Sequence, residues 1–214
     1  MPEKRDEGID FVKWFSELNK DSGSVAGGKG ANLAEIYNAK VNVPAGFVIT
    51  AQAYDYFIEK AGLKEQIETL LNSINYEDTK QLNEVTEKIR KSIIKAEFPK
   101  DLQEEILESY EALDTNNVKN NATGTVLEIL KNSEPIFVAV RSSATTEDLA
   151  DASFAGQQES FLNIKGKTEL LLTIKKCLAS LFTSRATYYR NKKGYRDTKA
   201  SLAVVVQRMV DSDK

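Results

Sequence analysis

The sequence predicts a mixed α/β fold that is rich in helix, from two kinds of apolar pattern. Short continuous apolar runs, typical of buried strands, occur at residues 47–49, 136–140 and 202–206. Apolar residues at helical spacing dominate residues 50–116 and 167–190. The chain has 214 residues, of which 41% are hydrophobic, and this is enough for one large domain or two small ones.

Composition excludes several classes of function. The formal net charge is −3, so there is no basic excess to neutralise a nucleic-acid backbone or an anionic membrane surface. No apolar run reaches the roughly 18 residues of a membrane span, and we expect a cytoplasmic protein. The chain has no histidine, which excludes a histidine base, metal ligand or phosphohistidine on this polypeptide alone. Its one cysteine, Cys177, lies in an apolar helical stripe and is expected to be a small core residue.

The first 50 residues mix helical and turn patterns. Residues 10–18 carry apolar side chains at spacings that favour a short amphipathic helix. A loop with four glycines follows at residues 21–30, and helical spacing resumes over residues 31–38. A turn at residues 43–46 precedes the first buried strand, residues 47–49.

The middle of the chain, residues 51–115, is predicted to be a helical segment. Thr50 is a candidate N-cap for a helix that Gly62 ends. Further helices are expected at residues 63–71, at residues 78–96 and from Pro99 toward Leu113. The alternating Glu and Lys residues of this segment indicate a solvated face. Residues 116–134 are polar and rich in asparagine, which indicates a surface connection.

The last third changes to strand and helix patterns. A buried strand at residues 136–140 ends at Arg141, and a polar loop follows through Ser153. A second strand is expected at residues 158–164, then a long helix over residues 167–190. The final predicted strand, residues 202–206, runs into Gln207.

The glycine loop resembles a phosphate-binding loop without matching one fully. Residues 23–30 fit the pattern G-x-x-x-x-G-K, but Gly30 replaces the hydroxyl residue that would bind magnesium. The segment before it also has a helical pattern instead of a strand, so we reject the Walker interpretation. Glycines, a following helix N-terminus and Lys29 still suit an anion. A plain glycine turn with a surface lysine is an equal alternative.

Arg141 is the second candidate, because a charged residue at the end of a buried strand must be paired or aimed into a cleft. Ser142 and Ser143 add hydroxyl groups beside it. A structural salt bridge to Glu147 or Asp148 explains the pattern equally well.

Two further segments carry candidate groups. Small residues around Gly156 suit a loop that folds over a ligand, with Phe154 as a lid, although an edge hairpin has the same pattern. At the end of the last strand, the amide of Gln207 suits contact with an adenine edge or a phosphate.

Taken together, these segments resemble one known family. The motifs are Val25-Ala26-Gly27-Gly28-Lys29-Gly30-Ala31-Asn32-Leu33, Val43-Pro44-Ala45-Gly46-Phe47, Val140-Arg141-Ser142-Ser143-Ala144-Thr145, Asp151-Ala152-Ser153-Phe154-Ala155-Gly156-Gln157-Gln158-Glu159 and Val206-Gln207-Arg208-Met209. In this order they resemble the phosphoenolpyruvate synthase (pyruvate, water dikinase) family. Pyruvate phosphate dikinase and rifampicin phosphotransferase share this type of domain.

The resemblance implies that residues 1–214 are the N-terminal portion of an ATP-grasp domain. Its strand-containing, nucleotide-binding part would comprise about residues 20–50 and 135–210. The residues that match the family's ATP-binding positions are Lys29, Arg141, Gly156, Ser160 and Gln207. The family's Mg²⁺ ligands match no position here and are expected beyond Lys214.

In the family, ATP phosphorylates a catalytic histidine on its way to pyruvate, with release of AMP and phosphate. The resemblance therefore implies a cytoplasmic phosphotransferase, and a homodimer for the full-length protein. The phosphohistidine and pyruvate-binding domains have no counterpart here, so the 214 residues are expected to bind nucleotide without full activity. The alternatives are a related dikinase or antibiotic phosphotransferase, a stand-alone nucleotide-binding module and, last, a helical interaction scaffold.

Overall fold

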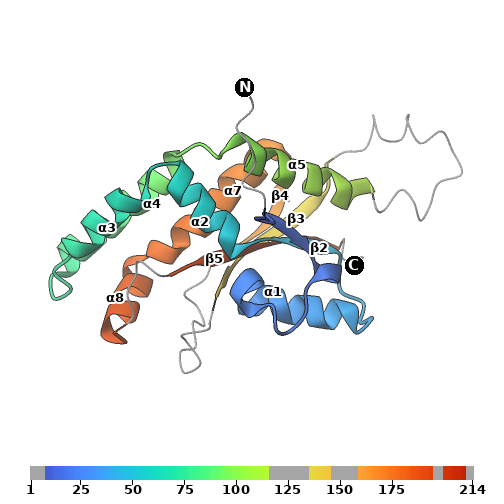
Figure 1. Ribbon diagram of the computed structural model, residues 1–214, viewed down its shortest axis with the longest axis horizontal. Helices are drawn as coiled ribbons and strands as arrows, with labels where there is room; N and C mark the ends of the chain where they lie inside the picture. The colour runs from blue at the N-terminus through green and yellow to red at the C-terminus, as the bar shows by residue number, and fades with distance from the viewer. Residues whose placement is uncertain (1–7, 116–134, 146–158, 195–199, 211–214) are drawn as a thin grey trace, which may run out of the picture.

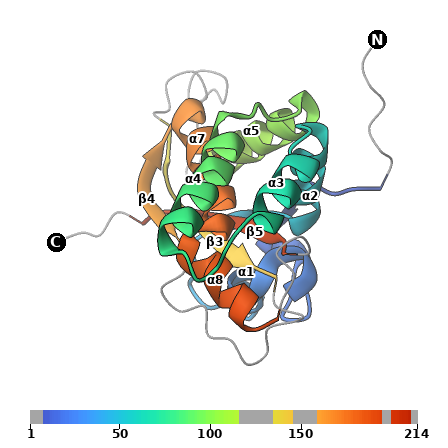
Figure 2. The ribbon, with the colours of Figure 1, turned by 90° about the vertical axis from the view of Figure 1, so that its left-hand side faces the viewer.

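A single five-stranded antiparallel sheet forms the centre of the protein. The computed structural model describes residues 8–115, 135–145, 159–194 and 200–210. The strands are β1 (Val12–Trp14), β2 (Gly46–Ile49), β3 (Phe137–Ala144), β4 (Ser160–Lys165) and β5 (Leu202–Arg208). Their order in the sheet is β1-β2-β5-β3-β4, so β4 is an edge strand, as the turned view shows (Figure 2).

Helices cover the two faces of the sheet unequally. They are α1 (Gly23–Asn38), α2 (Ala51–Lys60), α3 (Lys64–Asn72), α4 (Thr79–Lys95), α5 (Lys100–Thr115), α7 (Lys167–Ala179) and α8 (Ser184–Lys192). Short 3₁₀ turns lie at Phe15–Glu17 and Ser180–Phe182. Of the helices that the structure describes, α1 lies below the sheet, whereas α2, α4, α5 and α7 lie above it (Figure 1). The mixed α/β class predicted from the sequence is confirmed, and none of the described helices is long and apolar enough to cross a membrane.

Strands β2 and β5 contribute alternate side chains to two separate cores. On the multi-helix face, the side chains of Phe47, Val140 and Val204 belong to the larger core. On the α1 face, Val48 and Val205 pack with residues of α1 in a smaller core. Because both faces of the central strands are buried, these strands appear in the sequence as unbroken apolar runs.

Several predicted boundaries are confirmed at the level of single hydrogen bonds. The hydroxyl of Thr50 accepts a hydrogen bond from the Ala53 N–H at 3.1 Å and caps α2. Asp78 caps α4 in the same way, through the N–H groups of Lys80 and Gln81. Cys177 is fully buried in the larger core, as its apolar stripe predicted.

Several predicted elements differ from the structure. Residues 10–18 form strand β1 and a 3₁₀ turn instead of a helix, because β1 pairs with β2 and this tertiary contact outweighs local spacing. The predicted long helix 167–190 is broken at Thr183, whose extended backbone and capping hydroxyl start α8. Strand β3 continues to Ala144, so Arg141 lies within the strand. The predicted connection over residues 116–134 lies outside the described residues.

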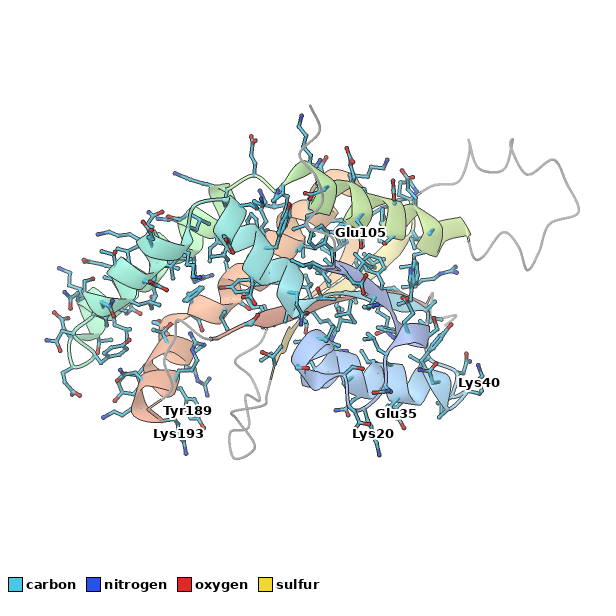
Figure 3. The ribbon with its side chains drawn as sticks, viewed as in Figure 1. Lys20, Glu35, Lys40, Glu105, Tyr189 and Lys193 are labelled. Carbon is cyan, nitrogen blue, oxygen red and sulfur yellow. The ribbon has the colours of Figure 1, made fainter. Side chains whose placement is uncertain are left out.

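Side chains of helix α5 form hydrogen bonds to edge strand β1 and to the start of β3. The carboxylate of Glu105, labelled in Figure 3, accepts a hydrogen bond from the N–H of Val12 at 3.1 Å on edge strand β1. The buried hydroxyl of Tyr110 donates to the carbonyl oxygen of Ile136 at 2.7 Å and accepts from the N–H of Gly166 at 3.0 Å. Tyr110 therefore joins α5, the start of β3 and the start of α7.

Replacing Tyr110 with phenylalanine will lower the free energy of unfolding by about 1–3 kcal/mol, because the half-buried backbone groups of Ile136 and Gly166 lose their hydrogen bond to the tyrosine hydroxyl. Urea denaturation measures this change. Tyr37→Phe is the matched control: Tyr37 is only half-buried, and its substitution is expected to change stability by less than about 0.5 kcal/mol. Equal effects of the two substitutions would contradict the role given to the Tyr110 hydroxyl.

Candidate functional site

Four of the five residues predicted to bind nucleotide lie on the α1 side of the sheet. Val205 packs toward α1, and Arg141 is its direct partner on β3, so the Arg141 side chain is on the same face. Ser160 on β4 is directly opposite Arg141 on the other side. Gln207 follows Val205 by two residues and shares its face. Gly156 lies outside the described residues.

The glycine segment is part of helix α1 and not the loop that was predicted. Gly27 interrupts the helix with φ 65° and ψ 169°, which divides it into a first turn and a main body. A Cβ atom at Gly27 would overlap the carbonyl and side-chain oxygens of Ser143. Only glycine combines this backbone conformation with so close an approach to β3.

Ser143 joins the interrupted helix to the sheet. Its buried hydroxyl donates to the carbonyl oxygen of Ala26 at 2.8 Å and accepts from the N–H of Gly30 at 3.1 Å. It thus caps the main body of α1 from a distant strand, since the first N–H groups of a helix have no partner within it. From the sequence, Ser143 is one hydroxyl residue among several, and its role as a helix cap is not predicted; its position one residue after Ser142 in a strand that begins as a buried apolar run is the only local signal.

Lys29 lies on the first turn of the main body of α1 and reaches β3. Its ammonium donates to the carbonyl oxygen of Ser142 at 3.1 Å. The N–H of the same residue, Ser142, donates to the carbonyl oxygen of Glu159, so the polar groups of Ser142 point toward β4. The Lys29 ammonium is therefore placed where β4 begins, which is also where Arg141 meets Ser160.

The electrostatics of Lys29 follow from this position. Burial lowers the pKa of Lys29 from its ordinary value, and the positive charge of Arg141 lowers this pKa further. The two cations therefore repel, and an anion placed between them would relieve that repulsion.

Gln207 and Ser160 occupy different surroundings at the margins of the site. The amide of Gln207 donates to the carbonyl oxygen of Pro44 at 3.2 Å, which holds it against the turn before β2. The Ser160 side chain is exposed. Beyond it on β3 and β4, Phe137 and Leu162 are 44% and 60% exposed, so this end of the sheet is open.

The described residues contain no group of three or more acidic or cysteine side chains placed to bind a metal ion. Burial raises the pKa of the Cys177 thiol, and the charge of Glu159 acts in the same direction. The thiol stays protonated at neutral pH and is unsuited to nucleophilic chemistry.

Comparison with known proteins identifies the family. The family model described as "Pyruvate phosphate dikinase, AMP/ATP-binding domain" matches residues 23–214. The chain belongs to this family. The match covers α1, the whole helical segment and strands β2 to β5.

Individual relatives carry a related name. The chain is 43% identical over 209 residues to a probable phosphoenolpyruvate synthase of Methanothermobacter thermautotrophicus, covering 98% of this chain and 28% of the relative. It is 46% identical over 202 residues to one from Staphylothermus marinus, covering 94% and 23%. With the phosphoenolpyruvate synthase of Helicobacter pylori it shares 44% identity over 208 residues, covering 95% and 24%. The chain thus spans about a quarter of the length of these relatives.

Replacing Gly27 with alanine is expected to lower the free energy of unfolding by about 2–3 kcal/mol, because the new Cβ adds backbone strain and an overlap with β3. Thermal or urea denaturation measures the change. Gly23→Ala, in the first turn of the same helix, meets no atom within 4 Å and serves as the control. A loss of stability at Gly23 as large as that at Gly27 would contradict this account of the kink.

Replacing Arg141 with glutamine is expected to raise the pKa of Lys29, because a neighbouring positive charge is removed. The pKa is measured by ¹³C-methyl NMR of the reductively methylated protein, with the Lys29 signal assigned from a Lys29→Arg variant. Arg185→Gln, an exposed position on α8, is the control and leaves the Lys29 signal unchanged. An unchanged Lys29 pKa in Arg141→Gln would show that the two cations do not share one site.

Proposed function

We propose that this chain binds ATP on the α1 side of its sheet, where β3 meets the start of β4. The observation that carries the proposal is the placement of Lys29 and Arg141 close enough for one charge to affect the other. A triphosphate offers anionic charge to this pair of cations, and membership of the AMP/ATP-binding domain family supports a nucleotide as its source.

The two cations have different roles in this proposal. The backbone of Arg141 is held within β3 by pairing on both sides, and its planar guanidinium is a fork that suits two phosphate oxygens. Lys29 is a point charge whose hydrogen bond to the carbonyl oxygen of Ser142 can be exchanged for one to phosphate. The main body of α1 begins beside them, and its N-terminal N–H groups add partial positive charge.

The remaining predicted contacts extend from this pair. We assign Ser160, at the start of β4, to the nucleotide and Gln207 to the region of the adenine. Gly156 lies outside the described residues, and its assignment to the nucleotide rests on the sequence motif alone. In this proposal residues 1–214 are the N-terminal portion of an ATP-grasp domain. No magnesium ligand is assigned to the described residues, because they offer no suitable acidic cluster.

The reaction of the whole protein is proposed from the relatives that are named phosphoenolpyruvate synthase. It converts ATP, pyruvate and water to AMP, phosphoenolpyruvate and phosphate through a phosphohistidine. The chain has no histidine, so the phosphorylated group must lie on another part of the protein. Phosphoryl transfer needs mainly positioning and positive charge, and these are what Lys29 and Arg141 would contribute.

Isothermal titration with ATP in the presence of Mg²⁺ tests the proposal. Arg141→Ala and Lys29→Ala are each expected to raise the Kd by about 10- to 100-fold, because each removes a charge-assisted hydrogen bond. The loss is expected to be larger for Arg141, since its fork is rigid. Lys20→Ala is the control: Lys20 lies on the far side of α1 from the sheet (Figure 3) and should leave the Kd unchanged.

Unchanged affinity in both Arg141→Ala and Lys29→Ala would contradict the site assignment. An absence of saturable binding by the wild-type chain would contradict nucleotide binding by these residues alone.

A further inference from the structure

Glu159 links the proposed site to the opposite face of the sheet. It immediately precedes β4, and its carbonyl oxygen accepts two hydrogen bonds from Ser142, from the N–H at 3.1 Å and from the hydroxyl at 3.2 Å. These bonds fix the point at which β4 joins β3. They therefore also fix the position of the adjacent residue pair of the β3–β4 ladder, in which Ser160 lies opposite Arg141.

The side chain of Glu159 belongs to the multi-helix face. Neighbouring residues of an extended chain point to opposite sides, and Ser160 faces the α1 side. On this face, Nη2 of Arg90 on α4 lies 3.9 Å from Oε1 of Glu159.

Arg90 has an unused donor next to this contact. Its Nε atom is buried and has no hydrogen-bond partner among the described residues. Nε and one terminal nitrogen of a guanidinium form a planar fork that matches the two oxygens of a carboxylate. A small movement that brings Glu159 into this fork would satisfy the buried Nε and replace a single long contact with two short ones.

We propose that Arg90 is a positioning residue for the nucleotide site: from the far side of the sheet it holds Glu159, and through Glu159 it sets the Arg141–Ser160 pair that faces ATP. The inference rests on the proposed ATP-binding function. Arg90 lies in the helical segment whose charges the sequence assigned to a solvated face, and it does not itself touch the nucleotide.

The first test needs no nucleotide. Amide hydrogen exchange of Ser142 reports its bond to the carbonyl oxygen of Glu159, and Arg90→Ala is expected to speed this exchange by about five-fold through local opening of the β3–β4 junction. Ion pairs that are partly exposed to solvent add little to global stability, so the unfolding midpoint should stay close to that of the wild type. Lys91→Ala, the next residue on α4, removes a different ion pair, with Glu87, and is the control. Unchanged Ser142 exchange in Arg90→Ala would overturn the proposal.

The second test measures ATP affinity in a double-mutant cycle. Arg90→Ala and Glu159→Gln are each expected to raise the Kd by about five-fold, and the double variant by no more than either alone. The exchanged pair, Arg90→Glu with Glu159→Arg, should bind ATP better than either of its single substitutions. A role in general packing would not give this rescue, so additive losses without rescue would overturn the proposal.

The two tests separate this inference from the function on which it rests. Wild-type protein that binds no ATP would refute the proposed function, while the exchange rate of Ser142 would still decide whether Arg90 sets the strand junction. Wild-type protein that binds ATP, with Arg90 variants of normal affinity, would refute the positioning role alone.

Discussion

The hydrogen bonds of one serine determine where the candidate site lies. The Ser143 hydroxyl binds the carbonyl oxygen of Ala26 and the N–H of Gly30, on the two sides of the kink in α1. The kink requires Gly27, which lies directly against Ser143. Together with the packing of α1 against the sheet in the smaller core, this contact holds the first turn of the main helix body beside β3. Lys29 is on that turn, and its ammonium therefore lies next to β3, the strand that contains Arg141.

Successive side chains of a strand lie on opposite faces of the antiparallel sheet. Side chains that face the helical layer form the larger core, and their neighbours in sequence face α1. On β3 this alternation places Val140 in the core and Arg141 on the proposed nucleotide side. On β4 the same alternation sends Ser160 to that side and Glu159 to the other. A single strand junction is thereby connected to both layers of the protein.

The asymmetry of the helical layers also has a functional consequence. Several of the described helices bury one face of the sheet, whereas α1 covers part of the other (Figure 1). The exposed side chains of Phe137, Ser160 and Leu162 lie toward edge strand β4, where the sheet is open. Half-buried cations at the margin of such a surface have lost part of their hydration, and this strengthens their interaction with an anion.

The sequence by itself determined the buried strands, most helices with their caps, and the motifs that resemble a family, because these depend on residues close together in the chain. Thr50 and Asp78 are capping residues whose partners lie two or three positions away. Only the tertiary structure decided that residues 10–18 begin with an edge strand, that Arg141 lies inside β3 and that Lys29 reaches Ser142. These features depend on contacts between segments up to 113 residues apart. A local sequence pattern does not identify partners at such a distance.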